Sequence, residues 1–163
     1  MRSNDMNTKE SIIKNAKKIF ARESLEGLSM RVLAAESKIA LSVIYHYFPS
    51  KDDLLSELYK EVVDKFNQKA KDSQVGKTAK IKMRQFFEFC FENAHDISFC
   101  HKYFLSYRSR FRKNATGYLP LGLAEPLYDI VKQATKSKEI KTKDEYGDAK
   151  LLFFYIQGII LDY

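Results

Sequence analysis

The stretch SMRVLAAESKIALSVIYHYFPSKDDLL, residues 29–55, predicts two short helices in succession and the start of a longer one. Ser29 is a suitable N-cap for the first helix, which we expect to end near Ser37. The second helix should begin about three residues later, near Ala40, and Pro49 should stop it, because proline disfavours helical backbone in the residue before it. Two helices joined by so tight a turn are typical of a helix-turn-helix.

The flanking residues extend this pattern into further helices. Thr8 or Ser11 can cap a preceding helix, and Gly27 after it is expected to take the left-handed conformation that often ends a helix. On the other side, Ser50 and the acidic residue three positions later form a start similar to a capping box. Apolar residues at helical spacing then continue to about Asp72. The sequence therefore predicts three helices followed by one long helix.

The second helix of the helix-turn-helix has two different faces. Ile44 and Phe48 lie one turn apart and point the same way, which suits burial. Ser42, Tyr45 and His46 share another face, which carries hydroxyl and imidazole groups. The major groove of DNA is wide enough to admit an α-helix, so this second face is a candidate for contact with DNA.

Residues 73–163 predict a second group of helices. A phenylalanine-rich helix is apolar nearly all round and should be buried on most sides. In the strongly apolar last helix, we expect Gly158 to allow the close approach of another helix, within the chain or between subunits. The expected helices cover about 81–91, 97–110, 125–134 and 144–160. We therefore predict an all-α chain that ends in an antiparallel helical bundle.

Composition excludes several other classes of protein. The chain has 163 residues, of which 45% are hydrophobic and 30% charged, so it can bury a core. With only six Gly and three Pro, a sandwich or barrel of many short strands is disfavoured. The N-terminus does not have the pattern of a signal peptide, and no apolar stretch is long enough for a membrane span, so we expect a cytoplasmic protein with no membrane partner. The net charge of +7 suits a polyanionic partner.

The residues do not favour an enzyme or a cofactor. Three histidines occur without metal-ligand spacing, a phosphate loop or a nucleophile motif, although His95 and His101 leave a metal site near Asp96 as a weaker alternative. Cys90 and Cys100 are expected to be reduced, buried and inert, with a redox switch as the alternative.

Residues 8–60 resemble the DNA-binding signature of the TetR family of transcriptional repressors. The resemblance is carried by Phe20, Gly27, Ser29-Met30-Arg31, Leu33-Ala34, Ile44-Tyr45-His46-Tyr47-Phe48, Ser50-Lys51 and Leu54-Leu55. It implies a DNA-binding domain at 1–49 and a ligand-binding and dimerisation domain at 50–163, linked by the helix at about 51–72. It also implies a homodimer that binds a near-palindromic double-stranded DNA operator and is released by a small effector. The alternative is a helix-turn-helix protein that acts through protein contacts or non-specific nucleoid binding, without an effector.

The resemblance and the chemistry of the side chains together predict the DNA contacts. The phenolic hydroxyls and the residues at the helix starts would bind phosphates, and His46 can reach either a phosphate or a base edge. Leu41, Ser42, Val43 or their neighbours must read the bases. This sequence departs from the family where Ala40 replaces the usual serine cap and Leu41 replaces a polar or basic residue. The predicted DNA-binding residues are Ser29, Arg31, Leu41, Ser42, Val43, Tyr45, His46, Tyr47 and Lys51.

The effector and dimer sites are predicted from apolar residues of the second part. We expect an apolar or aromatic effector, with plain core packing as the alternative for each lining residue. A basic cluster, residues 108–113, could instead bind an anionic effector. The predicted ligand-binding residues are Phe87, Cys90, Phe91, Phe104, Tyr107 and Tyr155, and the predicted dimerisation residues are Leu152, Tyr155, Ile156 and Ile159.

Overall fold

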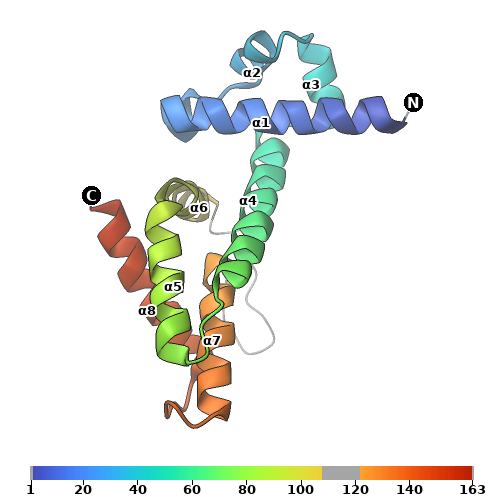
Figure 1. The fold of residues 1–163 in the computed structure, drawn as a ribbon. Helices are drawn as coiled ribbons and strands as arrows, with labels where there is room; N and C mark the ends of the chain where they lie inside the picture. The colour runs from blue at the N-terminus through green and yellow to red at the C-terminus, as the bar shows by residue number, and fades with distance from the viewer. Residues whose placement is uncertain (1, 108–121, 163) are drawn as a thin grey trace. The chain divides into compact units, whose positions relative to one another are not determined.

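The computed structural model describes residues 2–107 and 122–162, and in these ranges the chain is helical, with no strand (Figure 1). The prediction of an all-α chain is therefore confirmed. Contacts divide the chain into two compact units, residues 1–61 and 62–163, and the division falls inside one helix. The expected functional boundary at 49/50 stays a prediction. The helices are α1 (Arg2–Gly27), α2 (Met30–Ser37), α3 (Leu41–Tyr47), α4 (Lys51–Ser73), α5 (Ala79–Glu92), α6 (Ala94–Ser106), α7 (Glu125–Lys136) and α8 (Glu145–Leu161), with a short 3-10 helix, η2 (Gly122–Ala124), before α7.

The first unit contains the predicted helix-turn-helix, formed by α2 and α3 (Figure 1). The hydroxyl oxygen of Ser29 accepts a hydrogen bond from the backbone N–H of Val32 at 3.2 Å, so the predicted cap of α2 is confirmed. Ala40 occupies the N-cap position of α3 but offers no side-chain hydrogen bond there. Both helices pack through a core whose fully buried members include Ile12, Ile19, Leu28, Leu33, Ile44 and Leu54.

The ends of α1 differ from the prediction. The helix begins at Arg2, before the predicted caps Thr8 and Ser11, because each residue added to an existing helix gains a hydrogen bond without a new nucleation cost. Gly27 is the last residue of α1 and does not take a left-handed conformation; among the described glycines, Gly122 does. Space is the constraint at Gly27 instead, since a Cβ there would lie 2.5 Å from the Cβ of Glu23.

The start of α4 is fixed by a serine cap. The hydroxyl oxygen of Ser50 accepts from the backbone N–H of Asp53 at 3.1 Å, and the same hydroxyl donates to the Asp53 carboxylate at 2.7 Å. The predicted capping box therefore forms in part: the aspartate side chain is shorter than the usual glutamate and accepts a hydrogen bond from the Ser50 hydroxyl instead.

In the second unit, α7 packs against both α5 and α8. The second half of α4 belongs to this unit and is tied to the start of α7. Asn67 donates its amide to the carbonyl of Gly122 at 3.0 Å, and Lys71 pairs with Glu125 at 2.9 Å and Asp129 at 3.3 Å. The hydrogen bond to Glu125 raises the pKa of Lys71. These contacts fix the end of α4 to the segment 122–129.

Two predictions for the second unit need correction. The helix α5 is not buried on most sides, because Ile81 and Phe91 are about half exposed, whereas Phe86 and Cys90 are buried. Its neighbour α6 begins at Ala94, earlier than predicted. The predicted end of α6 near residue 110, and the basic cluster at 108–113, lie outside the described residues.

The two caps of the helix-turn-helix give a reciprocal prediction. We expect Ser29→Ala to lower the free energy of unfolding by about 1 kcal/mol, because the Val32 N–H loses its acceptor. We expect Ala40→Ser to raise it by up to about 1 kcal/mol, because Ala40 already has the extended backbone of an N-cap. Urea unfolding followed by circular dichroism measures both changes. An unchanged midpoint in both variants would show that the caps do not control the stability of this unit.

Candidate nucleic-acid interface

The helix α3 presents a polar face to solvent. Ile44 and Phe48 are 0% and 2% exposed, so the apolar side of the helix is fixed inward. Ser42, Tyr45 and His46 are all exposed, with Tyr45 at 46%. The imidazole of His46 meets the ring of Tyr47 edge-on, at 5.2 Å between centroids. The three side chains predicted to face DNA therefore share an accessible surface that can donate and accept hydrogen bonds.

The apolar residues predicted to read bases flank this face. Leu41 and Val43 are half-buried, as is Tyr47. Each keeps part of its side chain accessible beside Ser42, so an apolar contact with a thymine methyl group is chemically possible. The rest of each side chain lies in the protein's own packing.

The residues predicted to hold phosphates lie at the starts of two helices. Arg31, in the first turn of α2, is exposed. Ser29 accepts a hydrogen bond as the cap of α2, and a hydroxyl that accepts can still donate to a phosphate oxygen. Lys51 is the first residue of α4 and is half-buried, and the positive end of a helix favours anions there.

The turn between α2 and α3 contains a feature that the sequence reasoning missed. Lys38 has φ 55° and ψ 38°, the left-handed conformation that usually requires glycine. The Lys38 N–H donates to the carbonyl of Ala35, and the Ile39 N–H donates to that of Ala34, both at 3.2 Å. This pair of bonds is a Schellman motif, in which the residue after the helix must be left-handed. A non-glycine residue directly after a predicted helix end is the signal that could have drawn attention to Lys38.

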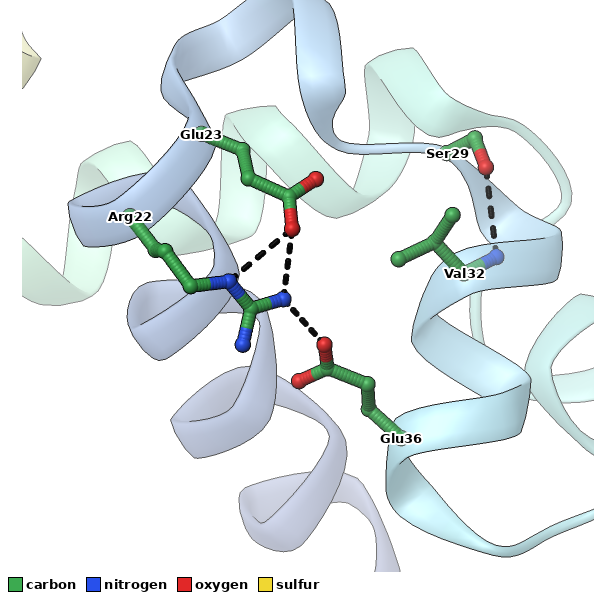
Figure 2. Close-up of polar contacts among 5 residues, drawn as sticks. All are labelled: Arg22, Glu23, Ser29, Val32 and Glu36. Carbon is green, nitrogen blue, oxygen red and sulfur yellow. Dashed lines mark hydrogen bonds and ion pairs between the residues drawn. The ribbon is translucent and has the colours of Figure 1, made fainter.

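An ion-pair cluster joins α1 to α2 (Figure 2). The guanidinium of Arg22, near the end of α1, donates to Glu23 from Nε at 2.9 Å and from Nη2 at 2.6 Å. The same Nη2 also bonds to Glu36 on α2. The hydrogen bonds with Glu36 and then Glu23 raise the pKa of Arg22. Because Glu36 lies in the last turn of α2, this cluster holds the helix that leads into the turn at Lys38.

Further ion pairs fix α1 against the first turns of α4, within the same unit. Lys9 pairs with Glu57 at 2.8 Å, and Lys17 pairs with Glu61 at 3.4 Å. The ammonium of Lys9 also lies 5.7 Å from the centre of the Phe48 ring, which is buried beneath α3. Lys9 and Lys17 thus hold α1 against α4, and Lys9 also contacts the residue that ends α3.

The predicted ligand-binding residues are distributed over different environments. Cys90 is buried, Phe87, Phe104 and Tyr107 are half-buried, and Phe91 is exposed. Tyr155 is 67% exposed and lies on the outer surface of α8. The buried Cys90 and the exposed Tyr155 thus lie in different environments, one in the core and one at the surface. The effector site stays a prediction.

The outer surface of α8 is apolar and concave. We call it the α8 face: Leu151, Phe154, Tyr155, Gly158 and Ile159, which with Asp162 line a depression of about 420 Å³. Its four large apolar side chains are each more than half exposed. A Cβ at Gly158 would meet nothing within 4 Å, so the expected close helix approach does not occur within the described chain.

The predicted dimerisation residues divide between this face and the core. Tyr155 and Ile159 lie on the α8 face, and Leu152 is half-buried. Ile156 is 5% exposed and packs inside its own unit, so it has no surface to offer a second subunit. The prediction was wrong about which side of the helix Ile156 occupies, because in a helix that is apolar all round the sequence does not show which side is buried.

Two further kinds of feature are absent from residues 2–107 and 122–162. No group of three or more His, Cys, Asp and Glu side chains is arranged to hold a metal ion in these ranges. None of the described helices combines the length and apolar character needed to cross a membrane.

Comparison with known proteins identifies the N-terminal part of the chain. Residues 12–58 match the family described as bacterial regulatory proteins, tetR family. An uncharacterized HTH-type transcriptional regulator of Haemophilus influenzae is 38% identical over 66 residues, which are 40% of this chain and 35% of the relative. The match thus spans about a third of that relative's length.

Solved structures share the fold over almost the whole chain. A TetR-family transcriptional regulator from Haemophilus influenzae is 25% identical, with a TM-score of 0.62 over 95% of this chain and 82% of the other. The fatty acid degradation regulator FadR from Bacillus halodurans is 19% identical, with a TM-score of 0.68 over 95% and 83% of the two chains. A TetR-family regulator from Pectobacterium atrosepticum is 13% identical, with a TM-score of 0.70 over 98% and 83%.

Burial gives a prediction for the thiols. It raises the pKa of Cys90 from 9.0 to about 12, so the thiol stays protonated at neutral pH. In a Cys100→Ser variant, where Cys90 is the remaining thiol, we expect alkylation at pH 8 to be at least about 100-fold slower in the folded protein than in urea. Because the folded-state pKa is raised, this thiol's stabilising contribution is complete below pH 9 and is lost as pH approaches 12. Rapid labelling of the folded variant, followed by mass spectrometry, would contradict an inert Cys90.

Proposed function

We propose that the chain is a regulator of the TetR family that binds double-stranded DNA and represses transcription, because residues 12–58 match that family and form the helix-turn-helix. The observation that carries this proposal is that α3 has one buried apolar face and one exposed polar face. Ile44 is fully buried, whereas Ser42, Tyr45 and His46 are exposed on the same short helix. Such a protein acts in the cytoplasm, where its DNA is.

The proposed contacts divide into positioning and reading. Tyr45, Tyr47 and Lys51 donate hydrogen bonds to phosphate oxygens, and these bonds set the register of α3 in the major groove without selecting a sequence. Leu41 and Val43 flank the exposed Ser42 and contact thymine methyl groups, which favours sites that contain A·T pairs.

We further propose a homodimer formed through the α8 face. Four large apolar side chains in one depression are costly to leave in water, and a second copy can cover them. A two-fold axis would place the same face on both subunits, and Gly158 would let the two α8 backbones approach closely. Two copies of α3 would then enter successive major grooves of a near-palindromic operator.

Release by a small effector is the last part of the proposal. The end of α4 is tied to the start of α7 through Asn67 and Lys71, and α7 packs on α5, which carries the predicted ligand residues Phe87, Cys90 and Phe91. An apolar or aromatic effector that displaces α7 would pull on α4, whose first turns belong to the DNA-binding unit. That FadR is named for fatty acid degradation makes a fatty acid or its derivative a reasonable first effector to test.

A titration of two DNA duplexes tests the central proposal. One duplex carries the promoter upstream of the protein's own gene, and the other has the same composition in shuffled order. We expect the promoter duplex to bind at least roughly 1,000-fold more tightly, with an affinity that falls steeply as salt rises. Equal affinity for the two duplexes would support non-specific nucleoid binding, and no binding to either would support a function through protein contacts.

Two variants test the phosphate contacts. We expect Tyr45→Phe and Lys51→Ala to weaken binding to both duplexes by the same factor, roughly tenfold or more, because each removes a hydrogen bond to a charged oxygen. Tyr128→Phe, which removes a hydroxyl from a half-buried position on α7, is the matched control and should bind normally. A changed ratio between the duplexes in either variant would show that the residue reads bases.

A matched pair of substitutions tests the dimer. We expect Ile159→Asp to sediment as a monomer at micromolar concentration, because it places a charge in the centre of the α8 face. Ile81→Asp on α5 makes the same change at 46% exposure, against 51% for Ile159, and should remain a dimer. If both variants stay dimeric with unchanged circular dichroism, subunits do not associate through this face.

A further inference from the structure

The backbone at Lys38 is strained, and a glycine at this position would remove the strain. Its φ of 55° costs a residue with a Cβ a factor of roughly five to thirty in the folding equilibrium, and glycine would avoid this cost. Strained backbone that persists in a native protein is concentrated at functional sites. Lys138 has the same conformation, so what distinguishes Lys38 is its position, three residues before the first residue of α3.

The turn does not allow Lys38 to relax into another conformation. Its own N–H and that of Ile39 are committed to the carbonyls of Ala35 and Ala34. On one side, α2 is held by the bond between Glu36 and Arg22, and on the other, α3 is held by the buried Ile44. The direction in which the Lys38 side chain leaves the backbone is therefore set by its surroundings.

The side-chain ammonium of Lys38 is accessible to a binding partner. Its side chain is exposed, and among the described residues it makes no ion pair, unlike Arg22 on the adjoining helix. It precedes the first residue of α3 by three positions, and that residue, Leu41, has no charge. The cationic group at this end of α3 is thus supplied by the turn.

We propose that Lys38 is a further DNA-binding residue, whose ammonium neutralises a backbone phosphate beside the groove that α3 enters. This inference rests on the proposed DNA binding. A phosphate contact from the turn would position the start of α3, where Leu41 and Ser42 lie, without selecting a base.

A second lysine provides an internal control. Lys138 follows α7 with φ 63°, and its N–H and that of Glu139 bond to the carbonyls of Thr135 and Ala134. This is the same Schellman motif at the end of another helix, and Lys138 is also exposed. Any benefit of a cation at the negative end of a helix applies equally to both lysines, so a difference in DNA binding between them reports on position alone.

The experiment compares Lys38→Gly, Lys138→Gly and Lys38→Arg in the full chain. Binding to the promoter and shuffled duplexes is measured between about 50 and 200 mM salt, and stability is measured in urea. We expect both glycine variants to unfold at higher urea concentration than the wild type. Only Lys38→Gly should bind both duplexes roughly tenfold more weakly, with a salt slope reduced by about 0.9 for each subunit in contact, whereas Lys38→Arg should retain the slope.

Each other outcome overturns the inference. A Lys38→Gly variant that binds like the wild type, with an unchanged salt slope, shows that Lys38 is only a helix terminus. A loss of affinity for the promoter duplex alone shows that Lys38 reads bases. If the wild type binds neither duplex, the proposed DNA binding itself is wrong. This outcome is distinct from a failure of the Lys38 inference alone, in which the wild type still binds.

Discussion

The burial of Ile44 and Phe48 is the constraint on which the DNA-binding unit depends. A helix of seven residues does not form by itself in water, so α3 exists because these two side chains are held in the core. Each such burial contributes about 1.5–3 kcal/mol. Since successive residues turn by about 100° around a helix, fixing this side also fixes where Ser42, Tyr45 and His46 point.

At the start of α3, the same unit is less stable than other residues at two positions would make it. Ala40 provides no side-chain cap, and Lys38 is left-handed where glycine would be relaxed. Stabilising contacts lie at its other edges, in the cap formed by Ser29 and in the bonds from Arg22 to the end of α2. The scaffold is therefore well fixed, and the strained or uncapped residues gather at the turn that we propose to approach DNA.

The second unit combines a packed interior with an apolar exterior on α8. The interior is fixed in part by polar contacts that bind the end of α4 to η2 and α7, through Asn67 and Lys71. The exterior keeps Phe154 and Ile159 in water within one depression. Such a surface is suited to contact with a second copy or another apolar partner.

The sequence alone determined the order of the helices and the outward face of α3, because caps, proline and apolar spacing act between neighbours in the chain. The tertiary structure decided which side of α8 is inward, and so moved Ile156 into the core and left Gly158 open. It also decided the conformation of Lys38, since only the fixed positions of α2 and α3 impose a left-handed residue between them. When apolar residues occur on all sides of a helix, the sequence does not show which side is buried, and packing against residues distant in the chain decides this.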